Sequence, residues 1–197
     1  VYEIFLEVIF NQLGRNLDSK WQKPAERQRL ASSLVEIYES VRSKFTVDEH
    51  RHYLFTPRNL TAWVKALIRY DFQTCDLLDA IVYEARKMFR DVLVGNDSFS
   101  KFDSILNGTM RSQWHHNAST NEVYYTSLAG SASTNMKSEG KTNEEEKGGD
   151  TETMKGITKL LPIDNDDFKQ VISQGIMYYE REEKELRMLL FPEILEH

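Results

Sequence analysis

The sequence predicts a mainly α-helical protein with a minor β element and a long polar insertion. Apolar side chains recur every three or four positions in several segments, which is the spacing of helices that bury one face. Hydrophobic residues make up 40% of the 197 residues, which is enough for a real core. Residues 107–156 differ sharply from the rest, because Ser, Thr, Asn, Gly, Glu and Lys dominate them.

Two helices are predicted in the first part of the chain, with a polar break between them. In residues 2–13 the apolar side chains at helical spacing are Tyr2, Phe5, Leu6, Ile9, Phe10 and Leu13. Residues 25–44 repeat this spacing with Leu30, Leu34, Ile37 and Val41. Pro24 suits the first turn of the second helix, because its missing N–H costs nothing there.

Two further helices are predicted downstream. One begins at Pro57 after the N-cap candidate Thr56, and its apolar stripe consists of Leu60, Trp63, Val64, Leu67 and Ile68. The other covers residues 76–94, and its apolar side contains Leu78, Ile81, Val82, Ala85, Phe89, Val92 and Leu93. Gly95 can adopt a left-handed conformation, so we expect it to end this helix.

The last part of the chain is predicted to lose and then regain regular structure. The polar segment cannot bury enough apolar surface to offset its ordering entropy, so we expect disorder there. Within it, Val123–Thr126 is β-prone and is expected to form one strand of a hairpin. Order is expected to return near Leu160, with a helix that is capped by Asp164–Asp167. A charged run, Glu180–Glu185, is most simply a solvated helix face, and it leads into a Leu-rich end.

Composition and charge exclude several classes of protein. The formal net charge is −6, whereas dedicated nucleic-acid binders normally show a basic face. The single cysteine, Cys75, can form neither an internal disulfide nor a cysteine-rich zinc site, which fits a reducing cytosol. No apolar run approaches the length of a membrane span. Because the chain starts at Val1 and its last predicted helix runs to its end, we expect a segment of a longer protein.

Two weak motifs carry no function. Gly140-Lys141-Thr142 resembles the end of a phosphate-binding loop, but Asn135 stands where the first glycine should be and no buried strand precedes it. The histidines His50, His52, His115 and His116 lack carboxylates or cysteines at metal-ligand spacing, so we predict no metal ligands.

Pro57-Arg58, at the start of the third helix, is the strongest functional signal. The helix dipole favours anions at a helix amino end, so an arginine in the first turn is electrostatically disfavoured. The arrangement becomes useful if an external anion binds there, because Arg58 and free backbone N–H groups would converge on one phosphate. A bland surface arginine is the alternative interpretation.

Three segments carry a resemblance to a known family. His52–Val64 (HYLFTPRNLTAWV) resembles the start of the AAA+ small (lid) domain of dynein heavy chains, where an aromatic residue, Ser or Thr, Pro and Arg precede a helix with Leu and Trp. Val82–Val94 (VYEARKMFRDVLV) resembles the next signature of this lid. Leu189–His197 looks like the helix that enters the following AAA+ module.

The resemblance implies a position in a larger machine. Lys44–Asp48 and Leu67–Asp71 are most similar to the branch of the family that drives retrograde intraflagellar transport, and the implied place is the lid of the third AAA+ module with the connection to the fourth. The expected organisation is a helix from the end of the preceding large domain, a helical lid, a polar insertion and helices that lead to the next module: residues 1–23, 24–106, 107–159 and 160–197.

The resemblance also implies roles for particular residues. Arg58 takes the place of the sensor-2 arginine, which contacts nucleotide phosphates. The side chains of Glu84, Arg86 and Arg90 are candidates for contacts between modules, and solvated surface charge is the equally simple alternative. No catalytic residue is expected, because the Walker motifs, sensor 1 and the arginine finger of the family are missing from this sequence. ATP or ADP would be held mainly by other parts of the parent chain.

Partners and location follow from the same resemblance. They are the neighbouring AAA+ modules, subunits of the dynein complex and, through other regions, microtubules, in the cytoplasm and the cilium. A free-standing helical adaptor that binds partner helices is the alternative function. The 107–156 segment is either a tolerated surface insertion or a docking loop regulated by phosphorylation.

Overall fold

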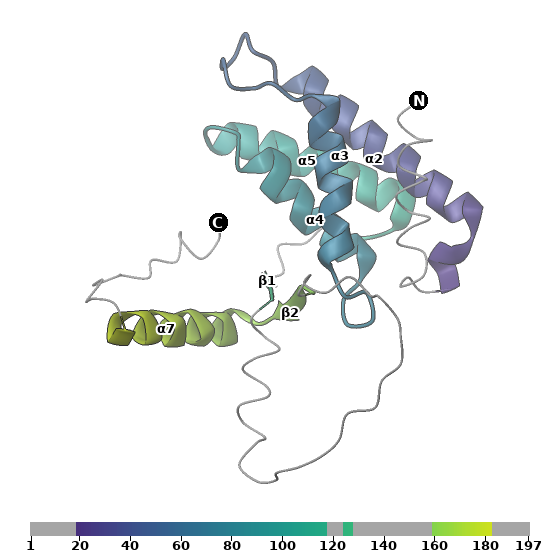
Figure 1. Cartoon of the computed structure of the whole chain (residues 1–197). Coiled ribbons are helices and arrows are strands. Elements are labelled where there is room, and N and C mark those ends of the chain that lie inside the picture. Colours follow the sequence, from purple (N-terminus) through teal and green to yellow (C-terminus); the bar gives the residue numbers. More distant parts are fainter. Residues whose placement is uncertain (1–18, 118–123, 128–158, 183–197) are drawn as a thin grey trace. The chain divides into compact units, whose positions relative to one another are not determined.

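The computed structural model describes residues 19–117, 124–127 and 159–182, and Figure 1 shows their secondary structure. The chain divides into two compact units, and the main boundary between them in the sequence lies between Thr120 and Asn121. Each unit is described by itself below. Among the described residues, no helix combines the length and apolar character that crossing a membrane requires.

The first unit is a helical assembly built on two long helices. α2 (Pro24–Lys44) and α5 (Asn96–Trp114) pack against each other, although they are far apart in the sequence. α3 (Pro57–Ala66) packs on α4 (Leu77–Ala85) and also contacts α2 (Figure 1). The short 3-10 helices η1 (Ser19–Gln22) and η2 (Leu67–Arg69) and the π-helical segment η3 (Arg86–Arg90) complete this unit. These helices confirm the predicted starts at Pro24 and Pro57.

The core of this unit is centred on Phe89, which is fully buried. Its ring centroid lies 5.3 Å from that of Trp63 on α3, 6.5 Å from that of Phe102 on α5 and 5.8 Å from that of Phe55 in the preceding loop. The core also includes the buried apolar residues of α2, at the predicted spacing: Leu30, Leu34, Ile37 and Val41. One aromatic ring therefore joins three segments of this core.

The predicted helix over residues 76–94 is interrupted. The α-helical hydrogen bonding of α4 ends at Ala85, and the chain continues as a π-turn in which the Asp91 N–H donates to the Arg86 carbonyl at 3.1 Å. This extra residue per turn changes the phase of the apolar face. Val92, predicted to be buried, is 37% exposed, and Ile68, which lies past the end of α3, is 43% exposed.

α5 extends well beyond the predicted end of the lid. The boundary placed between residues 106 and 107 falls inside this helix, so the disorder predicted from residue 107 is wrong for residues 107–114. Leu106, Met110 and Trp114 are four residues apart, and all three side chains are buried. Most residues between these positions are polar, and these polar residues occupy the other faces of the helix.

The second unit confirms the predicted hairpin and the helix that follows it. Strand β1 (Tyr124–Thr126) pairs antiparallel with β2 (Leu161–Ile163), with Thr126 opposite Leu161. α7 (Asn165–Glu182) follows directly, and the Asp164 carbonyl accepts a hydrogen bond from the Phe168 N–H at 2.8 Å. The Phe168 ring stacks on Tyr124 at 4.9 Å, which fixes the helix to the hairpin.

Several predictions lie outside the described residues. These are the helix over residues 2–13, the Gly140-Lys141-Thr142 motif, most of the polar insertion and the Leu-rich end after Glu182.

Candidate functional site

The candidate site lies at the amino end of α3, and the segment that leads into it is fixed by the core. Tyr53 and Phe55 are buried, whereas Leu54 between them is 67% exposed, which is the alternation of an extended chain on a packed surface. The Tyr38 hydroxyl of α2 donates to the Phe55 carbonyl at 3.4 Å, and the Val94 N–H donates to the Tyr53 hydroxyl at 2.8 Å.

The first turn of α3 is capped by a neutral side chain. Thr56 has an extended backbone conformation, and Pro57 occupies the first helical position. Asn59 Oδ1 accepts hydrogen bonds from the Thr56 N–H at 2.9 Å and from the Thr56 hydroxyl at 3.0 Å. The Asn59 amide also points its Nδ2 at the sulfur of Met88, 3.9 Å away on η3. Because the first turn holds no acidic residue, the positive end of the helix dipole is not compensated by its own side chains.

Arg58 is exposed on this turn, which both the anion-binding interpretation and the surface-arginine interpretation expect. Within the described part of the chain its guanidinium has no carboxylate within ion-pair distance, whereas Arg69, Arg86 and Arg90 each have one. A guanidinium offers several N–H donors to a phosphate oxygen pair, and the α3 dipole adds to its attraction for an anion. These are the features that favour an anion at a helix amino end.

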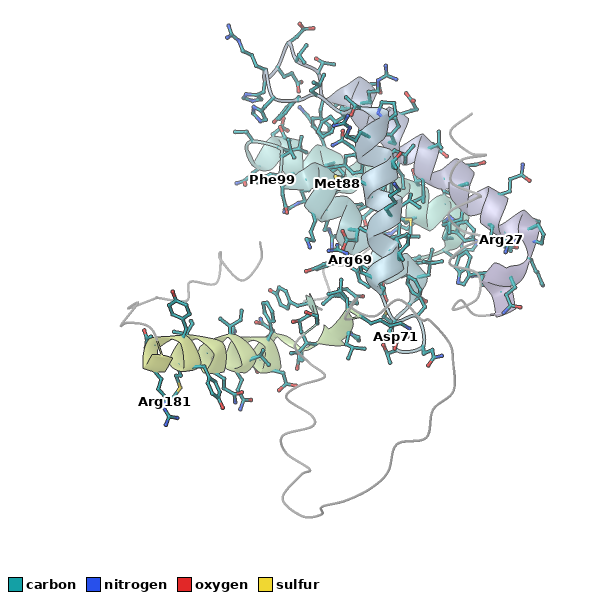
Figure 2. The ribbon with its side chains drawn as sticks, viewed as in Figure 1. Arg27, Arg69, Asp71, Met88, Phe99 and Arg181 are labelled. Carbon is teal, nitrogen blue, oxygen red and sulfur yellow. The ribbon has the colours of Figure 1, made fainter. Side chains whose placement is uncertain are left out.

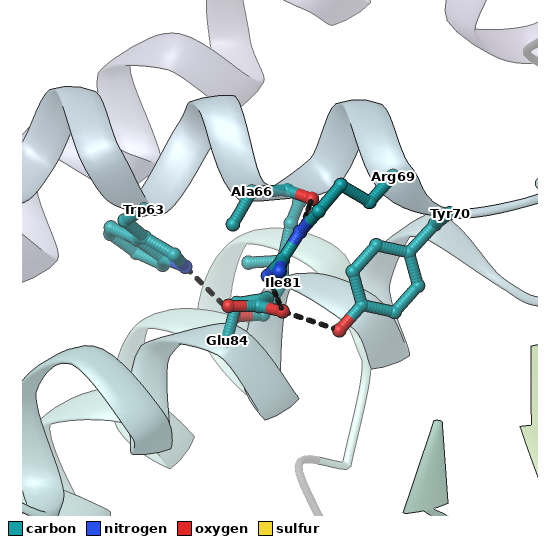
Figure 3. Close-up of polar contacts among 6 residues, drawn as sticks. All are labelled: Trp63, Ala66, Arg69, Tyr70, Ile81 and Glu84. Carbon is teal, nitrogen blue, oxygen red and sulfur yellow. Dashed lines mark hydrogen bonds and ion pairs between the residues drawn. The ribbon is translucent and has the colours of Figure 1, made fainter. Parts of the chain in front are cut away.

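Glu84 does not lie at the surface, so its assignment to a contact between modules is wrong. Its carboxylate is buried and accepts hydrogen bonds from the Tyr70 hydroxyl at 2.6 Å and from Arg69 Nη2 at 3.2 Å (Figure 3). Arg69 also donates to the Ala66 carbonyl, and nearby the Trp63 indole N–H donates to the Ile81 carbonyl at 3.0 Å. This cluster ties α3, η2 and α4 together, because a buried carboxylate must keep its donors.

Arg86 and Arg90 share one carboxylate inside the same unit. Arg86 Nε lies 3.6 Å and Arg90 Nε 3.4 Å from the two oxygens of Asp103 on α5. The Arg90 guanidinium also lies over the ring of Phe99, 4.5 Å from its centroid; Figure 2 labels Phe99 on α5. Both arginines are partly exposed, so their contact with a neighbouring module stays a prediction, but each first serves to fasten η3 to α5.

His52, His116 and Cys75 have structural contacts. His52 Nε2 lies 3.1 Å from the Val92 carbonyl, and His116 Nε2 lies 3.0 Å from Asp79 Oδ1. Among the described residues, no group of three potential ligands is placed to hold a metal ion. Burial and the carboxylates of Asp71, Asp76 and Asp79 raise the pKa of the Cys75 thiol to about 11, so the thiol stays protonated at neutral pH.

Two residues that shape this site were missed by sequence reasoning: Tyr53 and Asn59. The alternation of Tyr53, Leu54 and Phe55 is a signal of an extended segment with two buried rings, and it could have indicated Tyr53. Nothing in the local sequence predicts the partner of the Tyr53 hydroxyl, since Val94 is 41 residues away.

Comparison with known proteins supports the helical fold of the first unit. Residues 5–98 match the family described as "Dynein heavy chain, ATPase lid domain". Proteins named "Cytoplasmic dynein 2 heavy chain 1" are 36% identical in Tripneustes gratilla, 34% in Mus musculus and 32% in Homo sapiens, in each case over 100% of this chain. The chain spans only 4% to 5% of the length of these relatives. The helical fold around Arg58 is that of an AAA+ small domain, and the chain belongs to the dynein heavy chain family, with its ATPase lid domain at residues 5–98.

Proposed function

We propose that this lid closes over a nucleotide held by the large domain of its own AAA+ module, and that Arg58 contacts the nucleotide phosphates. The observation that carries the proposal is the exposed guanidinium of Arg58 on the first turn of α3, which has no ion-pair partner in the described part of the chain. The residues at this helix end fit a phosphate, since they combine a cation, a helix dipole and a neutral cap.

The described residues give the lid a mechanical role in this proposal. The helices α2, α3, α4 and α5 share one core around Phe89, so they can move together as a rigid body when nucleotide binds or is hydrolysed. The bound nucleotide would supply the phosphate charge. This chain would supply Arg58, which contacts the phosphate, and a rigid helical core that moves as one body. Hydrolysis itself is assigned to other parts of the parent ATPase, so the lid is non-catalytic.

The wider assignment follows the names of the relatives. Because several are called cytoplasmic dynein 2 heavy chain 1, we assign the chain to a motor of minus-end-directed intraflagellar transport. The lid would belong to the third module and lead to the fourth, with neighbouring modules and dynein subunits as partners, in the cytoplasm and the cilium. The matched segment is a small part of each relative, which favours this assignment over a free-standing adaptor.

Replacement of Arg58 in the full-length heavy chain tests the proposal. Arg58→Ala should weaken binding of the fluorescent nucleotide mant-ADP to this module by about ten- to a hundredfold, the usual value of hydrogen bonds to a charged group. Other nucleotide-binding modules would be disabled so that only this one is measured. Arg58→Lys should restore part of the affinity, because it keeps the charge without the planar fork.

Arg51 supplies the matched control. It is an exposed arginine in the loop before α3, so Arg51→Ala removes the same charge from the same end of the lid. This variant should bind mant-ADP like the unmodified motor. Equal affinities for Arg58→Ala and the unmodified motor would reject the proposed contact.

A further inference from the structure

Tyr53 is a buried tyrosine whose hydroxyl joins two distant parts of the lid. Its side chain is 2% exposed, and its ring packs edge-on against Phe45 at 5.9 Å. The hydroxyl accepts a hydrogen bond from the Val94 N–H at 2.8 Å, across 41 residues of sequence. Packing alone would be satisfied by phenylalanine, so the hydroxyl has a role that the ring does not explain.

This bond joins the two segments that lead into α3 and α5. We call each of these segments the entrance of its helix. Tyr53 lies three residues before the N-cap of α3, and Val94 lies directly before Gly95, the N-cap of α5. On its other side, the same α3 entrance is held by the Tyr38 hydroxyl of α2, which donates to the Phe55 carbonyl. The direction in which the chain enters α3 is therefore set by hydrogen bonds to α2 and to the start of α5.

Arg58 depends on that direction, because it lies on the first turn of α3. A guanidinium contributes to phosphate binding only when its donors face the phosphate, and a displacement of about 1 Å can cost a large factor. Without the Tyr53 hydroxyl, the Val94 N–H would lose its partner and the two entrances could separate.

We propose that the Tyr53 hydroxyl is a positioning group for Arg58: it holds the entrance of α3 against the start of α5, so that the guanidinium is presented to phosphate in a fixed geometry. This inference rests on the proposed function of Arg58 and adds to it a residue that touches no nucleotide. It also makes the site sensitive to movement of α5, since the same bond joins the two helices.

The test is Tyr53→Phe in the full-length heavy chain, in which only this module can bind mant-ADP. The expected result is about three- to tenfold weaker binding, the effect of losing one neutral hydrogen bond. If Tyr53 acts through Arg58, adding Tyr53→Phe to Arg58→Ala should weaken binding no further. Faster hydrogen exchange in residues 91–98 would show that the bond to Val94 has been lost.

Tyr70→Phe is the matched control. It removes the same atom from another buried tyrosine, whose hydroxyl donates to Glu84 at 2.6 Å. It should destabilise the lid without weakening mant-ADP binding. A purely structural role for Tyr53 would make the two variants alike.

The outcomes separate the two proposals. Weaker binding in Arg58→Ala together with unchanged binding in Tyr53→Phe would overturn the role of Tyr53 and leave the role of Arg58 intact. The role of Tyr53 would also be overturned if Tyr53→Phe and Tyr70→Phe weakened mant-ADP binding equally. It would be overturned as well if the effects of Tyr53→Phe and Arg58→Ala on binding were fully additive. Unchanged binding in Arg58→Ala would overturn the proposed function and this inference together.

Discussion

Charged residues on the helices of this lid are either exposed to solvent or buried with hydrogen-bond partners. Arg58 is exposed and has no ion-pair partner among the residues that the structure describes, whereas Glu84 is 3% exposed and accepts hydrogen bonds from two donors. Both follow from the same general rule, that a charge is buried only where partners replace its water. The difference lies in what the fold brings to each position.

Removal of the Glu84 carboxylate should strongly destabilise the lid. Glu84→Ala leaves the Tyr70 hydroxyl without its acceptor, so we expect the free energy of unfolding to fall by about 2–3 kcal/mol. Glu39→Ala is the control, because its ion pair with Arg42 is half-exposed and such pairs contribute about 0.5 kcal/mol. Urea unfolding, followed by the fluorescence of the buried tryptophans, measures the free energy of unfolding of both variants. Equal decreases in the two variants would contradict a stabilising role of the buried Glu84 cluster.

Cys75 should react slowly with alkylating agents at neutral pH. Its pKa of about 11 keeps the reactive thiolate scarce, and the rate should rise about tenfold per pH unit from pH 8 to pH 10. Asp71→Asn removes one of the charges that raise this pKa, so it should speed alkylation at pH 8.5. A rate that levels off near pH 9 would contradict the raised value.

The same shift has a consequence for stability. In the unfolded chain the thiol loses its proton near its ordinary pKa of 9.0, before the folded chain does. The Cys75 contribution to the free energy of unfolding is therefore constant below pH 9 and falls between pH 9 and pH 11. Cys75→Ala should lack this part of the pH dependence.

At the scale of elements, α5 is a helix whose polar composition prevented its prediction from the sequence. It begins after Gly95, which has a φ of +86°, and it contains Gly108 in its interior. Its buried side is narrow and carries Phe102, Leu106 and Met110. Because polar residues fill the other faces, composition predicted an insertion where the helix continues.

Two glycine substitutions in this region should change the free energy of unfolding in opposite directions. A Cβ at Gly108 meets no atom within 4 Å, so Gly108→Ala should raise the free energy of unfolding by about 0.5–1 kcal/mol. Gly95→Ala should lower it by about 1–3 kcal/mol, because its backbone conformation is one that only glycine adopts easily. Urea unfolding of the two variants measures both, and a destabilised Gly108→Ala would contradict the assignment of residue 108 to a helix.

At the scale of the whole molecule, the hairpin of the second unit is closed across a long stretch of chain. Residues 127–160 separate Thr126 from its partner Leu161. The entropy of closing a loop grows only logarithmically with its length, so this separation is compatible with a formed hairpin.

Shortening that connection should stabilise the hairpin. Replacing residues 128–158 by Asn-Gly should lower the closure cost by about 1.5 kcal/mol and slow hydrogen exchange of the amides in β1 and β2 by about tenfold. A Gly-Ser linker of the original length is the control and should leave exchange unchanged. Equal exchange in the two variants would contradict a closure effect.

Much of the helical framework could be predicted from the sequence alone. The stripes of Leu30 to Val41 and of Leu60 to Leu67 fixed two helices and their buried sides, and the hairpin strand at Tyr124 was also predicted. The Thr56-Pro57-Arg58 signal located the candidate site. These features are local, because helix spacing and capping depend on residues within a few positions of one another.

Only the tertiary structure decided which polar groups meet. It paired Glu84 with Tyr70, brought Arg86 and Arg90 to Asp103, and joined Tyr53 to Val94. The sequence alone shows that these groups exist, but it did not predict the helix that carries Asp103 or the end of α4 before Arg86 and Arg90. Their partners come from segments distant in the chain, and burial and hydrogen bonding depend on the packing that brings those segments together.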